Sequence, residues 1–248
     1  MKKGIYLDHV NFSYPGRPRV LSDVTLTIEP GSFVGMTGTN GSGKSTCTLL
    51  MNGLIPHSIA GKLTGSVFID GVNTRQKPVS YFARTVGMVF QNPDFSLFNL
   101  TVEEEVGFGL VNLTGSADKK RIDEALATVG LEGFQSRDPQ ALSYGEKQKV
   151  ALASVLALDV SYIILDEPTS MLDYKSSVDL YHLLTELNKS GKTIITVEHD
   201  TDFLLTCSQE MIIFDHGKVL KSGKTKKVFS DHTLLQSLGI KIPRGASV

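Results

Sequence analysis

The chain has 248 residues, of which 41% are hydrophobic and 21% charged, and its formal net charge is −1. A chain of this length and composition can bury a sizeable core, which excludes a disordered protein. A charge so close to zero argues against general nucleic-acid binders, which usually carry a basic excess, so we expect no nucleic-acid partner.

Two further features concern where the protein works. The two cysteines, Cys47 and Cys207, are too few for a disulfide framework, which fits a reducing cytosol. The N-terminal sequence MKKGIYLDHV lacks the apolar stretch of a signal peptide. No apolar run approaches the roughly 18 residues of a membrane span. We therefore expect a protein that does not cross a membrane but could dock onto a protein that does.

The first half of the chain predicts a strand, a glycine-rich turn and a helix in direct succession. The strand lies within 31–38, and the helix covers 45–54 until Pro56 stops it. Further strands are predicted at 65–71 and 85–91, where β-branched and aromatic residues lie between glycines and polar breaks.

The second half alternates helices with short apolar strands. The predicted helices are 119–130, 143–158 and 176–189. The predicted strands are 161–165, 192–197 and a hairpin over 211–223. This alternation predicts an α/β sheet, with a mostly helical insertion at about 92–158.

A phosphate-binding loop is the most specific motif. The stretch GTNGSGKST fits G-x-x-x-x-G-K-[ST], follows a predicted strand and opens a predicted helix, which argues against an ordinary glycine-rich turn. Its glycines let backbone N–H groups converge on an anion, beside the positive end of the helix dipole. Lys44 should reach the β- and γ-phosphates, and the Ser45 hydroxyl should bind Mg²⁺. The predicted ATP-binding residues of this loop are Gly38, Thr39, Asn40, Gly41, Ser42, Gly43, Lys44, Ser45 and Thr46.

Two acidic residues follow the strand predicted at 161–165. Ligands of open α/β sheets bind at the carboxyl ends of the strands, where Asp166 and Glu167 lie. We expect Asp166 to hold Mg²⁺, directly or through water, and Glu167 to orient or deprotonate the attacking water. Without the phosphate loop, two solvated acids in a capped loop would be the better interpretation.

Three other side chains are weaker candidates. His199 and Gln91 each follow a predicted strand, so both can face the edge that carries Asp166, and Gln91 could contact both metal and water. Tyr14 could stack on an adenine ring, as aromatic side chains do in other sites. For His199 the alternative is a structural histidine, and for Tyr14 it is a turn tyrosine that covers the core. For Tyr14, spacing alone favours this alternative.

In their order along the chain, these residues resemble the ATP-binding-cassette (ABC) ATPase family. The resemblance covers nearly the whole chain and includes LSYGEKQ at 142–148 and SMLD at 170–173. It implies one domain over 1–248, with a P-loop nucleoside triphosphate hydrolase core, a mostly parallel sheet, an antiparallel β subdomain and a helical subdomain. The implied parts are a core of 1–91 and 159–248 and a helical subdomain of 92–158 that carries the signature motif.

The family resemblance also implies a dimer of two ABC ATPase subunits that hydrolyses ATP with Mg²⁺. Each ATP would lie between the phosphate loop of one subunit and the signature helix of the other. Tyr14 would stack on adenine, Gln91 would be the Q-loop residue and His199 the switch histidine. Asp173 would be the D-loop residue that faces the partner subunit.

The signature stretch departs from the family pattern L-S-G-G-Q. Ser143 and Gly145 match it, whereas Tyr144 and Glu146 do not. Ser143 and Glu146 form the S-x-x-E pattern of a capping box, so we expect a helix to start here with the Ser143 hydroxyl pointing outward, toward the partner's ATP. Tyr144 would add bulk toward the partner, and Glu146 a negative charge near the γ-phosphate. The departures slightly favour a heterodimer over a homodimer.

A narrower resemblance lies in GMVFQNPDFSLFNLTVEEEVGFG at 87–109. This stretch is similar to the ATPases of energy-coupling-factor importers and of cobalt and nickel transporters. It implies uptake of a vitamin, a vitamin precursor or a cobalt or nickel ion, through a transmembrane scaffold subunit and a substrate-binding membrane protein. The chain would then be a peripheral subunit on the cytoplasmic face of the cell membrane.

An apolar cluster supports such a docking surface. Phe95, Leu97 and Phe98, with Leu100, follow Gln91 in a segment too irregular for a core helix. Exposed apolar clusters usually mark partner contacts, so we expect these residues to dock on the transmembrane partner. Packing beneath the helical lobe is the alternative.

Other proteins with this cassette are less consistent with the sequence. Repair and chromosome-maintenance ATPases carry long heptad repeats, and translation-factor types carry two cassettes, neither of which this sequence contains. A nucleotide-dependent regulatory module without hydrolysis is disfavoured by the intact phosphate loop and acidic pair. A soluble, non-transport ABC ATPase and a regulatory module are the alternatives to a transporter subunit.

Overall fold

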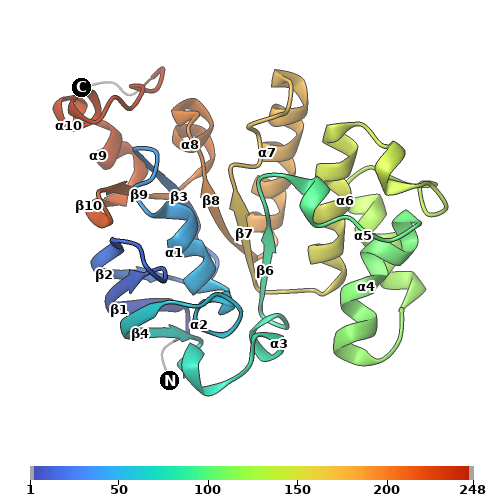
Figure 1. Ribbon diagram of the computed structural model, residues 1–248. Helices are drawn as coiled ribbons and strands as arrows, with labels where there is room; N and C mark the ends of the chain where they lie inside the picture. The colour runs from blue at the N-terminus through green and yellow to red at the C-terminus, as the bar shows by residue number, and fades with distance from the viewer. Residues whose placement is uncertain (1–2, 246–248) are drawn as a thin grey trace.

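The computed structural model describes residues 3–245, which form two β-sheets with helices around them (Figure 1). The smaller sheet is antiparallel, with the strand order β2-β1-β4-β5. Its strands are β1 (Ile5–Ser13), β2 (Arg19–Ile28), β4 (Lys62–Ile69) and β5 (Val72–Asn73). Burial largely alternates along β1, so one face of this sheet packs on the core.

The larger sheet has the strand order β10-β9-β3-β8-β7-β6. Its strands are β3 (Phe33–Gly38), β6 (Val86–Val89), β7 (Tyr162–Asp166), β8 (Thr193–Val197), β9 (Glu210–Asp215) and β10 (Lys218–Lys224). Strands β9 to β6 run parallel, and β10 pairs antiparallel with β9 in the predicted hairpin. Every residue of β3, β7 and β8 is buried, which explains their apolar sequences. The mostly parallel sheet and the antiparallel sheet are therefore as predicted.

Helices cover both faces of the larger sheet (Figure 1). Three lie near the antiparallel sheet: α1 (Lys44–Met51), α2 (Leu54–His57) and α3 (Val79–Phe82). Three pack together on the side of β6: α4 (Val102–Thr114), α5 (Lys119–Thr128) and α6 (Tyr144–Ala157). The last four are α7 (Tyr174–Lys189), α8 (Thr201–Cys207), α9 (Thr225–Phe229) and α10 (His232–Ser237). Short 3₁₀ turns occupy Thr74–Gln76, Pro93–Phe95 and Pro139–Ala141. None of these helices, within the described residues, is long and apolar enough to cross a membrane.

The parallel sheet separates two large apolar clusters. Successive residues of β7 face opposite sides, so Ile164 packs toward α1 and the antiparallel sheet, whereas Ile163 packs toward α4 to α7. A third, smaller cluster lies under α8 to α10. Because both faces of the sheet are covered, its carboxyl edge is the part that remains open for polar chemistry.

Two predicted helix boundaries are wrong. The first helix ends at Met51, and Gly53, with φ 78°, begins α2 in the left-handed conformation that a helix cannot continue. Pro56 lies within α2 and does not end α1. Helix α7 begins at Tyr174, two residues earlier than predicted, because the Asp173 carboxylate caps it by accepting from Ser176 N at 2.7 Å.

Candidate active site

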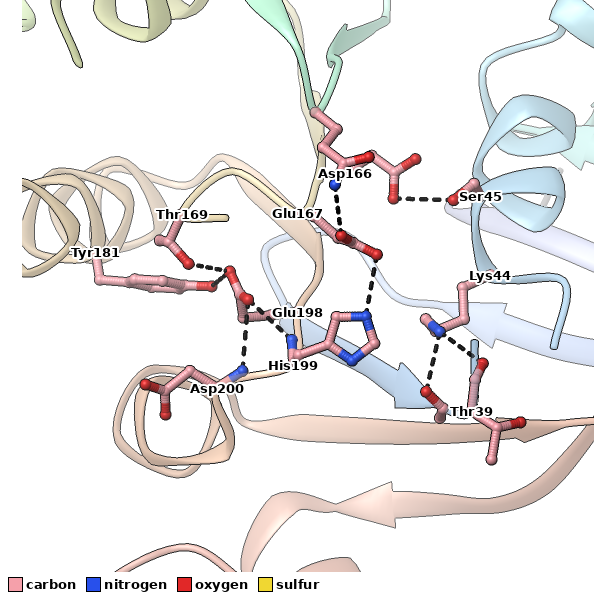
Figure 2. A network of polar contacts seen from close by, with 12 residues as sticks. Thr39, Lys44, Ser45, Asp166, Glu167, Thr169, Tyr181, Glu198, His199 and Asp200 are labelled. Atoms are coloured by element: carbon pink, nitrogen blue, oxygen red, sulfur yellow. Dashed lines mark hydrogen bonds and ion pairs between the residues drawn. The ribbon is translucent and has the colours of Figure 1, made fainter. Parts of the chain in front are cut away.

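The phosphate-binding loop joins β3 to α1, and its backbone contacts the Lys44 ammonium (Figure 2). Lys44 Nζ donates to the carbonyls of Gly38 and Thr39, both at 3.0 Å. Burial lowers the pKa of Lys44, and the nearby carboxylates of Glu167 and Asp166 act in the opposite direction. A lysine so enclosed is placed to meet an anion in the loop.

Two details explain the local sequence of the loop. At Gly38, with φ 147°, a Cβ would lie 2.0 Å from the Phe214 carbonyl oxygen, so only glycine fits between β3 and β9. The Thr39 hydroxyl donates to Asp215 at 2.6 Å, which ties the loop to the end of β9. The buried Ser42 hydroxyl has no protein partner among the described residues. Such a donor is available to a bound anion.

A hydroxyl and a carboxylate meet where α1 faces the end of β7. Ser45 Oγ donates to Asp166 Oδ1 at 3.2 Å (Figure 2). Burial raises the pKa of Asp166, and the hydrogen bond from Ser45 opposes this effect. No cluster of three His, Cys, Asp or Glu side chains suited to a metal occurs in the described part of the chain. The pair nevertheless fits Mg²⁺, which uses one or two protein oxygens together with substrate phosphates and water.

Glu167 is held between two donors from neighbouring strand ends. Its Oε2 accepts from Gln91 Nε2 at 2.8 Å, and its Oε1 lies 3.1 Å from His199 Nε2. Its backbone adopts φ 48°, a conformation that non-glycine residues rarely take and that clusters at functional sites. The expectation that Gln91, Glu167 and His199 share one edge of the sheet is confirmed. The metal-binding role of Gln91 stays a prediction, since its amide contacts Glu167 here.

One polar residue of this region was missed. Glu198 follows β8 directly and is buried beside His199 (Figure 2). The sequence TVEHD indicates such a residue, because a carboxylate that directly follows a buried strand of a parallel sheet has little access to solvent and needs hydrogen-bond donors from the protein.

Tyr14 lies next to the phosphate loop but also packs on the core. Its hydroxyl is 3.0 Å from Thr46 Oγ1, and its ring packs edge-on against Phe12 at a centroid distance of 4.9 Å. The second contact agrees with a tyrosine that covers the core. Adenine stacking therefore stays a prediction.

The signature stretch starts α6 with the predicted capping box. Ser143 is the N-cap, and the Glu146 carboxylate accepts from Ser143 N at 2.8 Å. Ser143 is exposed, and its Oγ donates a hydrogen bond to the Glu146 carboxylate at 2.7 Å, so its role toward a partner's ATP stays a prediction. A Cβ at Gly145 would meet only ordinary contacts, beginning 3.6 Å from Leu172, so packing within this chain does not require glycine there.

The Tyr144 side chain contacts its own chain, and the expectation that it adds bulk toward a partner stays a prediction. Its hydroxyl donates to the Gln91 carbonyl at 2.8 Å. One turn later, Lys147 Nζ pairs with Asp94 at 2.6 Å. The first turn of α6 is thus fixed to the segment that carries Gln91. Asp173 caps α7, and its D-loop role stays a prediction.

The predicted docking residues divide into exposed and buried ones. Phe95 is 89% exposed and Phe98 62% exposed, as a docking surface requires. Leu97 is only 4% exposed and packs in the core with the helices, so its assignment to this surface is wrong. Phe98 packs edge-on against Phe108 at 4.8 Å, beside an apolar groove of about 340 Å³.

The ABC transporter family profile matches residues 21–170 of the chain. The chain belongs to this family. An energy-coupling factor transporter ATP-binding protein of Methanocaldococcus jannaschii is 39% identical over 244 residues, which cover 95% of this chain and 84% of that protein. A Pyrococcus abyssi protein, named as a candidate ABC transporter ATP-binding protein, is 46% identical over 243 residues, which cover 96% of this chain and 87% of that protein.

Two solved structures share the fold of this ABC ATPase. One is CbiO1 of Clostridium perfringens, part of the ABC transporter complex CbiONQ, with a TM-score of 0.81, 30% identity, and coverage of 99% of this chain and 98% of that chain. The other is a dimeric ATP-binding cassette bound to ADP and phosphate, with a TM-score of 0.77, 32% identity, and coverage of 89% and 98%. The predicted family and the P-loop fold are confirmed.

Proposed function

We propose that this ABC ATPase is the ATP-hydrolysing subunit of an energy-coupling-factor importer for a vitamin, a vitamin precursor or a cobalt or nickel ion. The observation that carries the hydrolytic function is the Glu167 carboxylate, held by Gln91 and His199 at the edge that also carries the phosphate loop. The transport function is supported by the energy-coupling factor transporter relatives and by CbiO1.

ATP binds with its phosphates in the loop of residues 38–46, where Lys44 and the backbone N–H groups balance their charge. Ser45 and Asp166 would hold Mg²⁺. When bound, Mg²⁺ supplies neutralisation of the charge that develops on the phosphoryl group. The lowered pKa of Lys44 rises again when the phosphates arrive, because an anion stabilises the ammonium.

Glu167 acts as the general base. Its carboxylate takes a proton from water as the water oxygen attacks the γ-phosphorus, and the bond to the β–γ bridging oxygen breaks to give ADP and phosphate. Gln91 and His199 restrict the rotamers of Glu167, which keeps its oxygens aimed at the phosphate edge. Asp173 would face the partner subunit from the D-loop.

The functional unit is a dimer in which the signature residues Ser143, Gly145 and Glu146 act on the partner's ATP. The Ser143 hydroxyl must exchange its bond to Glu146 for one to phosphate, and the Glu146 charge opposes an anion at that position. Both effects weaken the site that this chain completes, which favours a different ATPase subunit as the partner.

The membrane subunits dock on Phe95 and Phe98 and on the groove beside them. We treat residues 92–158 as the helical subdomain that carries this surface, on the cytoplasmic face of the membrane. ATP-driven closure of the dimer moves the scaffold subunit through this contact, and product release reopens it.

Two variants and one purification test these roles. Glu167→Gln should bind ATP, form a stable dimer and hydrolyse ATP very slowly, whereas near-normal turnover would refute the base assignment. Lys44→Ala should lose nucleotide binding or turnover. Detergent purification from the native host, followed by mass spectrometry of the intact complex, should find membrane subunits bound to the chain. Their absence would favour a soluble ABC ATPase or a regulatory module.

A further inference from the structure

Glu198 is a buried carboxylate that makes four hydrogen bonds next to the proposed base. It is 3% exposed, in the turn between β8 and α8. Its Oε1 accepts from the backbone N–H groups of His199 at 2.8 Å and Asp200 at 3.4 Å. Its Oε2 accepts from the hydroxyls of Thr169 at 2.6 Å and Tyr181 at 3.3 Å (Figure 2).

The donors to Glu198 are all neutral and come from different parts of the chain. A buried carboxylate is costly unless its oxygens are hydrogen-bonded, and here both are. Burial and the charge of Glu198 raise the pKa of Tyr181, so its hydroxyl stays a donor at neutral pH. Removing the carboxylate would leave buried donors without an acceptor, so the geometry of the surrounding turn depends on it.

Two of these bonds join the segments that carry the proposed catalytic pair. Thr169 follows Glu167 by two residues, in the turn where Ser170 N donates to the Glu167 carbonyl at 3.2 Å. On the other side, Glu198 fixes the backbone N–H of His199 itself. These two hydrogen bonds form a Thr169–Glu198–His199 bridge, which connects the residues after β7 with the residues after β8. The bridge lies next to the 3.1 Å contact of Glu167 with His199.

We infer that Glu198 is a positioning residue for ATP hydrolysis: through Thr169 and the backbone of His199 it keeps the His199 imidazole in contact with the Glu167 carboxylate. This inference rests on the proposed roles of Glu167 and His199. It adds a buried acceptor that acts on the distance between Glu167 and His199. A shift of about 1 Å in a catalytic contact lowers a rate by roughly 100-fold.

The variants Thr169→Val and Thr169→Ser test the bridge without removing the buried charge. Valine keeps the shape of threonine but donates no hydrogen bond, and serine keeps the hydroxyl. Tyr181→Phe is the matched control, because it removes a hydroxyl from the same carboxylate oxygen but from α7 rather than from the turn after Glu167. With purified full-length chain and MgATP, we expect Thr169→Val to lower kcat by roughly tenfold or more with KM near wild type. Its Tm should also fall, because the buried carboxylate loses one donor. Thr169→Ser and Tyr181→Phe should keep wild-type kcat.

Substitutions of Glu198 distinguish a requirement for its hydrogen bonds from a requirement for its negative charge. Glu198→Ala should lower kcat at least as much as Thr169→Val, whereas Glu198→Gln should rescue most of it. The glutamine oxygen can still accept both backbone N–H groups, and its amide nitrogen can donate to the Thr169 hydroxyl oxygen. In the His199→Ala background, Thr169→Val should have no further effect on kcat, because the contact that the bridge maintains is already absent.

The outcomes distinguish this inference from the function on which it rests. If His199→Ala keeps normal turnover, the proposed role of His199 fails, and the inference fails with it. If His199→Ala is inactive while Thr169→Val and Glu198→Ala hydrolyse ATP at the wild-type rate, the inference is overturned and the proposed function stands. Additive losses in Thr169→Val with His199→Ala would also overturn it. If Glu198→Ala does not fold, Thr169→Val still decides the question.

Discussion

The substitution Glu146→Gln restores the family's usual signature residue and removes one charge from the capping box of α6. The wild-type carboxylate accepts two hydrogen bonds from Ser143, at 2.8 and 2.7 Å. Hydrogen bonds to a charged group contribute about 1.5–3 kcal/mol, against about 0.5–1.5 kcal/mol for neutral ones. Because these bonds lie at the surface and solvent screens them, we expect a net loss of only about 0.5–1 kcal/mol in the free energy of unfolding.

The effect of Glu146→Gln should depend on pH. The hydrogen bonds from Ser143 hold the pKa of Glu146 below its usual value. A carboxylate with a depressed folded-state pKa stabilises the fold fully above its unfolded pKa of about 4.3, and this contribution is lost as pH falls through the folded pKa. Calorimetry should therefore find Tm lowered by about 1–3 °C near neutral pH. The difference should vanish once the wild-type carboxyl is protonated.

A matched control is available in α4, where Thr101 and Glu104 form a second capping box. Glu104→Gln should also lower Tm slightly. In the complex with the partner ATPase, only Glu146→Gln should raise ATP turnover, because it frees the Ser143 hydroxyl and removes a charge from the partner's ATP site. An unchanged Tm near neutral pH would refute the capping argument, and equal turnover of both variants would refute the functional one.

Three further predictions concern docking, the Q-loop segment and the metal pair. Phe95→Ser should keep wild-type Tm but lose co-purification of membrane subunits, and co-purification equal to wild type would exclude this surface. Leu97→Ala should instead cost about 2–5 kcal/mol in unfolding free energy, because Leu97 is buried. Tyr144→Phe should leave ATP affinity unchanged yet increase hydrogen exchange of the backbone amides after Gln91, and unaltered exchange would contradict a tether. Asp166→Asn should raise the Mg²⁺ concentration that gives half-maximal turnover by at least roughly tenfold, and an unchanged Mg²⁺ dependence would refute the metal assignment.

The nucleotide site was predictable because its signals are local. A phosphate loop needs glycines, a lysine and a hydroxyl at fixed spacing, and acids at the end of an apolar strand reach the same sheet edge. The contact of Gln91, Glu167 and His199 follows from the same rule, since parallel strands end together. Helix boundaries were less certain, because a single glycine or aspartate cap at Gly53 or Asp173 overrides periodicity.

The features that the sequence did not reveal share a different cause. Leu97 and its exposed neighbours have the same apolar character, and only the packing of α4 to α6 decides which of them is buried. The Tyr144 side chain turns toward Gln91, 53 residues away in sequence, and no local pattern encodes such a contact. Glu198 was passed over because the value of a buried carboxylate depends on donors that arrive from distant segments.

The tether between Tyr144 and Gln91 has a thermodynamic consequence. In the proposed function, Gln91 serves this chain's own ATP, and the first turn of α6 serves the partner's ATP. A hydrogen bond and the Lys147–Asp94 ion pair join the two within one polypeptide. Linkage is reciprocal, so if this tether couples the two sites, this chain's ATP changes the affinity for the partner's ATP by the same factor by which the partner's ATP changes the affinity for this chain's ATP.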